Sequence, residues 1–195
     1  MTATAGIVLT GGRSRRLGVD KSTLLLAGET LAVRSARRLG AVCAPVVEAG
    51  DGVSGLPAIR EQPPGAGPLA GLAAAGAWLR EHGHPGPALL LAVDLPRIDE
   101  PLLRWLRDRP GAPTVVLRVD GRLQPVCARY GGDALLAAES LVTGGIRALH
   151  ELFDVVEHDV VEEDEWCVVV SRETFLDVDT PADAERLGIE LPGLA

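Results

Sequence analysis

The chain has 195 residues, the usual size of one domain, and is long enough to bury a substantial core. Hydrophobic residues make up 47% of it and aromatic residues only 3%, so we expect a core of Leu, Val and Ala. The formal net charge of −8 makes the surface as a whole a poor partner for nucleic acid or an anionic membrane. We therefore expect neither as a partner.

The cysteines and the N-terminus bear on where the protein works. Cys43, Cys127 and Cys167 lie far apart, and an odd number without a CxxC spacing indicates neither a disulfide framework nor a zinc site. Residues 1–6 lack the basic start and long apolar stretch of a signal peptide. No apolar run approaches the roughly 20 residues that span a bilayer. We therefore expect a cytoplasmic protein.

The first half of the chain alternates short apolar runs with amphipathic stretches. Residues 5–9 run into Gly11-Gly12, which is typical of a buried strand entering a loop, and Thr30 is a suitable helix N-cap. Residues 88–93 are apolar throughout, as in a central strand covered on both faces. The predicted strands are 5–9, 45–49, 56–59 and 88–93, and the predicted helices are 30–39, 68–79 and 99–107. This order favours a parallel sheet with crossover helices.

The second half is less regular. Two strand-like runs, 114–119 and 123–130, are joined by Asp120-Gly121, a strong hairpin signal. The last helix has a clear start, with Thr180 as N-cap and Pro181 in the first turn. Helices are predicted at 132–141, 145–152 and 180–187, and further strands at 155–161 and 167–170. One α/β domain over residues 1–195 fits this order best.

The segment 9–21, LTGGRSRRLGVDK, is the most informative part of the sequence. Glycines directly after a strand let backbone N–H groups approach phosphate oxygens without a Cβ in the way. Its basic residues, which stand out in an acidic protein, are Arg13, Arg15, Arg16 and Lys21. A Walker A loop needs glycine where Asp20 stands, and the fingerprint GxGxxG does not occur at this turn. The loop predicts triphosphate binding, with an exposed Arg-rich turn as the alternative.

This loop resembles the signature loop of the molybdenum cofactor guanylyltransferases, part of a wider group of nucleotidyltransferases. The resemblance continues through residues 67–71 (GPLAG), 93–96 (VDLP), 124–125 (QP) and 177–181 (DVDTP), and so covers nearly the whole chain. It implies a Rossmann-like, three-layer α/β fold with a mostly parallel central sheet. It also implies a nucleotide-binding half over about residues 1–110 and an acceptor-binding half over about 111–195.

The resemblance assigns roles within the loop. The positions that hold the nucleotide through their backbone correspond to Leu9, Thr10, Gly11 and Gly12. Arg16 and Lys21 correspond to the residues that neutralise the triphosphate and stabilise charge during the reaction. The doublet Gly11-Gly12 resembles the guanylyl-transferring branch, because cytidylyl-transferring relatives usually have Ala-Gly there. On this ground we expect GTP rather than CTP.

Asp94 follows the apolar run 88–93 and precedes Leu95-Pro96. A carboxylate at the carboxyl end of a central strand points into the crevice where open α/β sheets bind ligands. It is also a hard oxygen ligand suited to Mg²⁺, which takes one or two protein carboxylates plus substrate phosphates. The alternative is an Asp that only shapes the turn before Pro96. We predict that Asp94 binds Mg²⁺ at the nucleotide and is catalytic.

Other acidic residues are also candidates for the site, each with a plainer alternative or a weaker case. Asp177 and Asp179 face the same side of an extended stretch, where relatives commonly have Asn; Asp179 is a candidate second metal ligand, and helix N-terminal charge is the alternative. Glu61 stands where the family usually has Asp, and a carboxylate accepts hydrogen bonds from guanine N1–H and N2–H₂, with an exposed loop acid as the alternative. Glu48 is a weaker candidate for ribose or base contact.

The acceptor side is predicted from four residues. Arg147 follows Gly144-Gly145 at a predicted helix start, where an anion site is plausible on physical grounds. Gln124 lies at the hairpin, with simple solvation as its alternative role. The candidate acceptor-binding residues are Gln124, Arg147, Asp177 and Asp179.

The predicted reaction is attack by the terminal phosphate of molybdopterin on the α-phosphorus of GTP, with Mg²⁺ as cofactor and pyrophosphate as leaving group. Transient contact with other cofactor-biosynthesis proteins or molybdoenzymes would follow from this role. Related enzymes that use CTP or another acceptor, such as molybdopterin cytidylyltransferase or phospholactate guanylyltransferase, are one alternative. A non-catalytic GTP-binding regulator is another.

Overall fold

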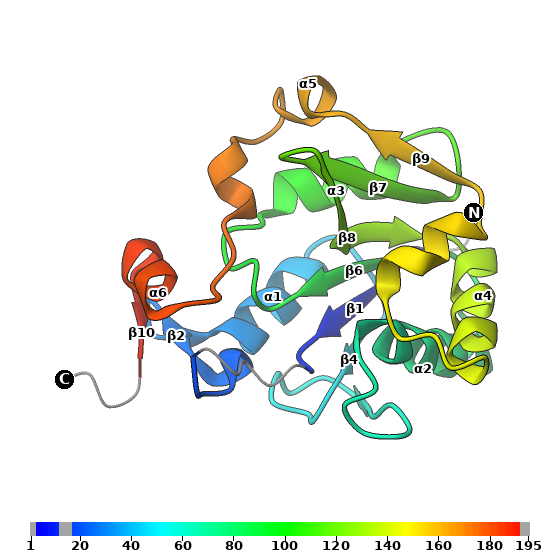
Figure 1. The fold of residues 1–195 in the computed structure, drawn as a ribbon, viewed down its shortest axis with the longest axis horizontal. Coiled ribbons are helices and arrows are strands. Elements are labelled where there is room, and N and C mark those ends of the chain that lie inside the picture. The colour runs from blue at the N-terminus through cyan, green and yellow to red at the C-terminus, as the bar shows by residue number, and fades with distance from the viewer. Residues whose placement is uncertain (1–2, 12–16, 192–195) are drawn as a thin grey trace.

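A seven-stranded sheet forms the centre of the computed structural model, which describes residues 3–11 and 17–191 (Figure 1). The strands are β1 (Ala5–Leu9), β4 (Val46–Ala49), β5 (Ala58–Ile59), β6 (Ala88–Ala92), β7 (Thr114–Val119), β8 (Arg122–Tyr130) and β9 (His158–Val161). They lie in the order β5-β4-β1-β6-β8-β7-β9. Of these seven, β8 alone runs antiparallel to its neighbours, so the expected mostly parallel sheet is confirmed.

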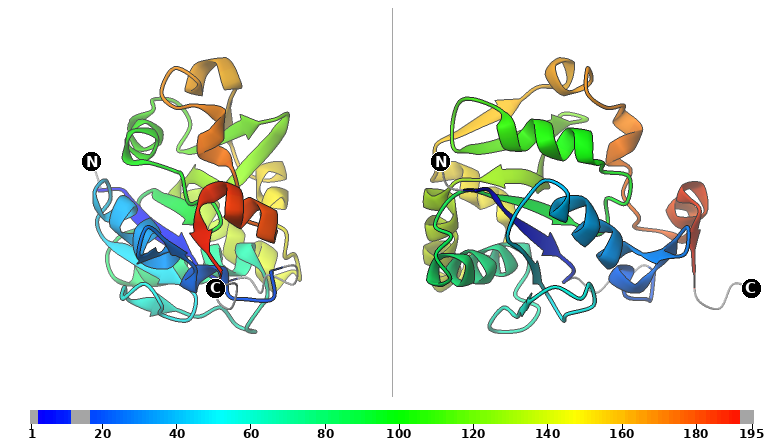
Figure 2. Two further views of the ribbon diagram at one scale, coloured as in Figure 1. Left: turned by 90° about the vertical axis from the view of Figure 1, so that its left-hand side faces the viewer. Right: turned by 180° about the vertical axis from the view of Figure 1, so that it is seen from behind.

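Helices cover both faces of the sheet, which makes the three-layer α/β fold that the sequence predicted. They are α1 (Leu31–Gly40), α2 (Pro68–Glu81), α3 (Glu100–Asp108), α4 (Gly132–Thr143), α5 (Glu163–Trp166) and α6 (Pro181–Leu187), with short 3-10 helices η1 (Lys21–Thr23), η2 (Leu149–Asp154) and η3 (Arg172–Phe175). α1 and α3 lie on one face, and α2 and α4 on the other (Figure 1, Figure 2). None of the helices in the described ranges is long and apolar enough to cross a membrane.

The central strands are apolar throughout because both of their faces are buried. Along β1, Val8 packs into the core beneath α1 and α3, while Ile7 and Leu9 pack into the core beneath α2 and α4. Leu89 and Leu90 of β6 alternate in the same way. An unbroken apolar run is therefore the expected pattern for these positions.

Local signals placed several elements correctly. The Thr30 hydroxyl accepts a hydrogen bond from Val33 N–H at the start of α1, as an N-cap does. Thr180 and Asp183 form a reciprocal capping box at the start of α6, with Pro181 in its first turn. The hairpin at Asp120-Gly121 is also present, since β7 and β8 pair directly across it.

Three predictions in the second half were wrong. Residues 167–170 form turns rather than a strand, because Trp166 is fully buried while Val168 is 81% exposed and Val169 and Val170 both donate to the Trp166 carbonyl. The predicted helix 145–152 does not form, since Gly145 has φ +90° after the end of α4, and only η2 follows. The strand predicted over 155–161 is limited to β9.

A second, small sheet was not predicted. It joins β2 (Leu25–Leu26), β3 (Glu29–Thr30) and β10 (Ile189–Glu190) in the order β10-β2-β3. Because β10 pairs antiparallel with β2, the C-terminal segment is held beside the residues that follow the basic loop. Elements from the two ends of the sequence thus lie side by side.

Arg129 of β8 is a charged residue inside the fold, with 6% of its surface exposed. Its guanidinium donates hydrogen bonds to carbonyls at the end of α3 and just after it, from Leu106, Arg107, Arg109, Ala112 and Pro113. Burial lowers the pKa of Arg129, and the nearby Asp159 opposes this. Its planar fork of donors can bind several carbonyls at the same time.

We expect Arg129→Met to destabilise the protein by about 3 kcal/mol or more, because several buried carbonyls lose a charged donor. Arg129→Lys should not restore the loss, since an ammonium group cannot reach the same set of acceptors. Urea unfolding followed by circular dichroism measures both. Arg122→Met, on an exposed residue of the same strand, is the control and should change stability by less than about 0.5 kcal/mol. Equal stability of Arg129→Met and wild type would contradict this account.

Candidate functional site

The carboxyl ends of β1, β4, β5 and β6 meet at one edge of the sheet, and the loops that follow them carry most of the predicted site. In open α/β sheets this edge is where ligands bind. Because β8 runs the opposite way, its beginning, with Gln124, lies at the same edge. The segment after α4 and the start of α2 also meet there: a Cβ on Gly67 would lie 3.2 Å from the Arg147 carbonyl oxygen.

The start of the basic loop is fixed by its neighbours. Thr10 N–H donates to the Ala49 carbonyl at 3.2 Å, and Val93 N–H donates to the Leu9 carbonyl at 3.2 Å. Gly71 allows α2 to approach, since a Cβ there would lie 2.9 Å from Leu9 Cδ1. Leu9, Thr10 and Gly11 therefore lie at the expected edge. Gly12 and Arg16, the other predicted residues of this loop, lie outside the described residues.

Lys21 lies between two of the predicted acidic residues. Its Nζ is 2.5 Å from Asp179 Oδ1 and 3.8 Å from Asp94 Oδ2. Asp20 fixes the backbone here by accepting hydrogen bonds from Ser22 N–H and Oγ at the start of η1. The Lys21 side chain is only 13% exposed, and it is the one lysine among the 19 Lys and Arg residues of the sequence. The structure thus brings together three residues that separate motifs had predicted.

Asp94 has an unusual environment. Its side chain is 32% exposed, but Oδ1 is buried and has no hydrogen-bond partner in the described part of the chain. Burial raises the pKa of its carboxyl group; Lys21 opposes this rise, while Asp177 and Asp179 add to it. A buried carboxylate oxygen without a donor is costly unless a cation or a proton joins it. The residues present therefore fit a divalent cation.

Protein side chains alone do not complete a metal site here. Within residues 3–11 and 17–191, no group of three His, Cys, Asp or Glu side chains could hold a metal ion. Mg²⁺ commonly takes one or two carboxylates and completes its shell with substrate phosphates and water. The arrangement at Asp94 is thus consistent with a cation that binds together with a nucleotide.

The turn after Asp94 is held by two arginines that the sequence analysis did not single out. Arg38 Nη1 donates to the Pro96 carbonyl at 2.8 Å and also to the Ile98 carbonyl, and Arg34 Nε donates to Pro96 at 3.2 Å. Burial, together with the charges of the neighbouring Arg34 and Arg37, lowers the pKa of Arg38 to about 10. Their i, i+4 spacing on α1 was the available signal, but nothing local indicates which carbonyls they bind.

The two glutamates considered for base contact behave differently. Glu61 is partly exposed after β5, and its Oε1 accepts a hydrogen bond from Gly65 N–H at 2.9 Å. Glu48 is fully buried, and protein donors occupy both of its oxygens. The expectation that Glu48 contacts ribose or base is therefore wrong. Its hydrogen bonds instead join two loops of the site.

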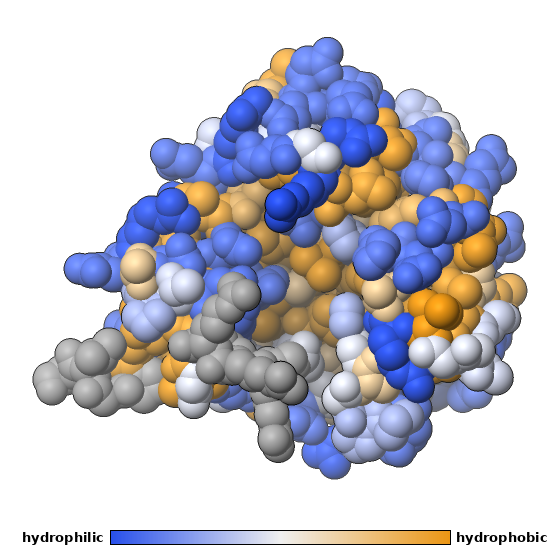
Figure 3. Space-filling model, viewed as in Figure 1, coloured by the Kyte–Doolittle hydropathy of each residue, from blue (hydrophilic) through white to orange (hydrophobic). Residues whose placement is uncertain are grey.

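The acceptor candidates lie around the same edge, but Arg147 is not at a helix start as predicted. Its Nη1 donates to the carbonyls of Val142 and Ile146, each at 3.0 Å, beyond the C-terminal end of α4. The side chain is exposed. Figure 3 shows the front of the molecule hollowed between the C-terminal segment and the α4 side, with apolar side chains at the floor of the hollow.

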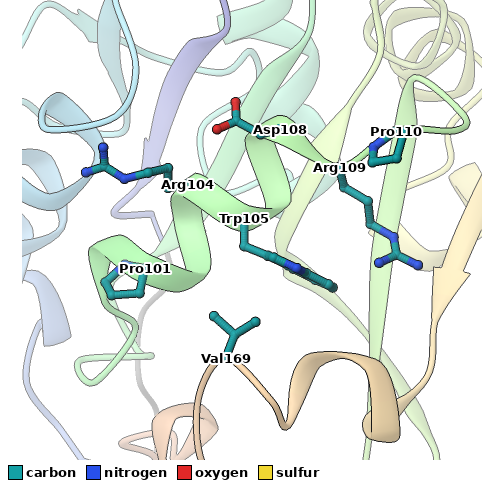
Figure 4. Close-up of a pocket in the computed structure, with 7 residues that line it drawn as sticks. All are labelled: Pro101, Arg104, Trp105, Asp108, Arg109, Pro110 and Val169. Carbon is teal, nitrogen blue, oxygen red and sulfur yellow. The ribbon is translucent and has the colours of Figure 1, made fainter.

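A separate groove of about 430 Å³ lies on the outer side of α3 (Figure 4). Its lining residues are Pro101, Arg104, Trp105, Asp108, Arg109, Pro110 and Val169. The Arg109 guanidinium stacks over the Trp105 ring, 4.9 Å from its centroid, and also pairs with Glu165. None of the predicted site residues that the structure describes lines this groove.

The sequence matches the MobA-like NTP transferase domain over residues 6–161. It is 39% identical over 158 residues to a protein of Opitutus terrae named "Probable molybdenum cofactor guanylyltransferase", and the match covers 76% of each protein. Together these matches cover both the basic loop and the Asp94 region.

Solved structures share the fold. Molybdopterin-guanine dinucleotide biosynthesis protein A from Archaeoglobus fulgidus aligns with a TM-score of 0.78 at 21% identity, covering 94% of this chain and 96% of that one. Rv0371C of Mycobacterium tuberculosis, described as a complex with manganese, aligns with a TM-score of 0.63 at 19% identity, covering 99% and 100%. At these identities the likeness concerns the fold.

We expect Asp94→Asn to raise the melting temperature of the protein at pH 7 in the absence of nucleotide and divalent cation. The raised pKa means that the folded state binds this proton more tightly than the unfolded state, so stability falls as the pH rises from the unfolded pKa through the folded one and stays lower above it. Each 1 kcal/mol regained corresponds to a shift of about 2–4 °C in a domain of this size.

Thermal unfolding between pH 4 and pH 7 provides the measurement. Wild type should lose stability as the pH rises from the ordinary carboxyl pKa through the raised one, relative to the variant. Asp154→Asn, an exposed residue at the end of η2, is the control and should match wild type. A lower melting temperature for Asp94→Asn would mean that its attraction to Lys21 outweighs the cost of burial.

Proposed function

We propose GMP transfer as the reaction of this chain, which belongs to the MobA-like NTP transferase family and, within it, to the molybdenum cofactor guanylyltransferases. The substrates are GTP and the phosphate of molybdopterin, and the products are pyrophosphate and the guanine dinucleotide form of the cofactor. The observation that carries the proposal is the meeting of Lys21, Asp94 and Asp179 at the ligand edge of the sheet. A cytoplasmic location and transient contact with other proteins of cofactor biosynthesis are part of it.

The nucleotide is held by the loop after β1. The backbone from Leu9 to Gly12 receives the nucleotide, and Lys21 and Arg16 neutralise its phosphates. Support comes from the position of Thr10 and Gly11 at the ends of β1 and β4. Glu61, after β5, is the residue we assign to the edge of the guanine base.

The charge balance requires further cations. Lys21 faces the carboxylates of Asp94 and Asp179, and the charge of Asp177 also acts on Asp94, so the carboxylates here outnumber the ammonium group of Lys21. A triphosphate would add more negative charge. We propose that Mg²⁺ binds at Asp94 with the phosphates, where it would neutralise charge on the reacting phosphoryl group. The structure described as a manganese complex is of a protein with a similar fold.

Catalysis then depends on positioning and charge. Lys21, freed from Asp179 by the incoming phosphates, stabilises charge on the triphosphate as the molybdopterin phosphate attacks the α-phosphorus and pyrophosphate leaves. The acceptor lies toward the half formed by residues 111–195, where Gln124, Arg147, Asp177 and Asp179 border the nucleotide-binding half. No covalent enzyme intermediate is part of the proposal.

Lys21→Ala and Asp94→Ala are each expected to lower turnover by about 100-fold or more, because each removes a group that acts on the phosphates. Pyrophosphate release in the presence of GTP, Mg²⁺ and molybdopterin measures this. The controls are Arg172→Ala and Asp108→Ala, which remove exposed charges outside the site and should leave turnover unchanged. Near-normal turnover in either site variant would remove that residue from the mechanism.

A substrate panel tests the identity of the reaction. Pyrophosphate release should require both GTP and molybdopterin, and should fall at least about tenfold when CTP replaces GTP, since a base edge read by hydrogen bonds discriminates well. Faster release with CTP would indicate a cytidylyltransferase, and release with another phosphorylated acceptor would change the acceptor. Tight GTP binding without pyrophosphate release would indicate a non-catalytic GTP-binding protein instead.

A further inference from the structure

Glu48, the third residue of β4, is a buried carboxylate that five protein donors surround. Its Oε1 accepts hydrogen bonds from Thr10 Oγ1 at 2.7 Å, Gly52 N–H at 2.8 Å and Val53 N–H at 3.1 Å. Its Oε2 accepts from Ser54 N–H at 2.8 Å and from the Ser54 hydroxyl. None of its surface is exposed. No oxygen of this carboxylate is left for a ligand.

The donors are neutral, yet they keep the group ionised. Burial raises the pKa of Glu48, but the hydrogen bonds from Ser54, Thr10 and Gly52 outweigh it, so the pKa lies below its ordinary value. Carboxylates that accept several N–H and O–H bonds are stabilised in the charged form. The same hydrogen bonds are therefore present throughout the neutral pH range.

These bonds join two loops that leave adjacent strands. Thr10 begins the loop after β1, and residues 50–55 form the turn after β4; β1 and β4 pair directly. The contact is close, because a Cβ on Gly50 would lie 1.8 Å from Thr10 Oγ1. With its hydroxyl directed to Glu48 and its N–H directed to the Ala49 carbonyl, Thr10 is fixed at this edge, and the backbone of Gly11 follows from it. The two loops thus form one unit at the ligand edge.

We propose that Glu48 is a positioning residue for nucleotide binding. Its hydrogen bonds hold Thr10 and residues 50–55 in the arrangement that receives the nucleoside part of the triphosphate. This inference rests on the proposed function and extends it to a residue that does not itself touch the substrate. Loops ordered before binding lose less conformational freedom when the ligand arrives, and the affinity rises accordingly. The Glu48 hydrogen bonds should therefore raise the affinity for the nucleotide and leave the binding of the acceptor unchanged.

Two variants test the contribution of the Glu48 hydrogen bonds. Glu48→Gln keeps the shape but replaces an acceptor oxygen with an amide group that faces N–H and O–H donors. Thr10→Val removes one hydroxyl and leaves the other four donors to Glu48 in place. We expect GTP to bind about tenfold or more weakly to Glu48→Gln and about threefold or more weakly to Thr10→Val, with the KM for molybdopterin unchanged.

The matched control is Thr114→Val. Thr114 is also a buried threonine, and its hydroxyl accepts a hydrogen bond from Gly131 N–H at 3.0 Å, at the start of β7 and so at the opposite edge of the sheet. This variant should lose stability but bind GTP with the wild-type Kd. A loss of folded protein lowers the binding stoichiometry and kcat, whereas loss of the Glu48 hydrogen bonds raises the Kd and the KM for GTP.

Isothermal titration of each full-length protein with GTP and Mg²⁺, without acceptor, gives Kd and stoichiometry. Wild-type Kd in Glu48→Gln and Thr10→Val, or an equally raised Kd in Thr114→Val, would overturn the proposal. If Glu48→Gln fails to fold, comparison of the Kd for GTP in Thr10→Val and in Thr114→Val tests the proposal. Wild-type protein that binds GTP but transfers nothing to molybdopterin refutes only the proposed transfer. Wild-type protein that binds no nucleotide refutes both.

Discussion

The contact between Lys21 and Asp179 joins parts of the chain that are far apart in sequence. Lys21 is the last residue of the basic loop, and Asp179 immediately precedes Thr180, the N-cap of α6. Two further interactions hold the C-terminal segment in place: Val178 N–H donates to the Asp94 carbonyl at 3.0 Å, and β10 pairs with β2. The ligand edge of the sheet is therefore completed by residues from the end of the chain, and the charges around Lys21 depend on that segment being docked.

Two carboxylates at this edge have buried oxygens, and they differ in whether hydrogen-bond donors compensate for the cost of burying the charge. Both oxygens of Glu48 accept hydrogen bonds from protein donors, and its pKa is lowered. Asp94 has a buried oxygen with no partner in the described residues, and its pKa is raised. The first arrangement stabilises the fold, while the second lowers stability until a cation binds. Uncompensated polar groups of the second kind are a common feature of functional sites.

The sequence predicted those features that depend on local patterns. The central strands and the N-caps at Thr30 and Thr180 each have a signal within a few residues. The small sheet has no such signal, because its strands are two residues long and form only through a contact between distant segments. The run Val168–Val170 has strong strand character, yet Trp166 fixes the backbone into turns by taking the buried position. Tertiary context decided these cases.

The same distinction applies to the site. Lys21, Asp94 and Asp179 were each predicted from their own motif, but their pairing depends on the path of the C-terminal segment. The partners of Glu48 are mainly backbone N–H groups of residues 52–54, which every residue except proline carries, so no side-chain pattern marks them. Sequence identifies the chemistry of a side chain more readily than the donors that surround it.

The choice of lysine at position 21 has a physical explanation within this chain. It is the one lysine among the 19 Lys and Arg residues, and the others include Arg38 and Arg129, whose guanidinium groups each bind several carbonyls at once. A guanidinium fixed by several bonds in one plane suits such static contacts. An ammonium group is a compact charge that rotates freely and makes few geometric demands. Lysine is therefore suited to a position where the partner changes from Asp179 to phosphate oxygens in the proposed complex.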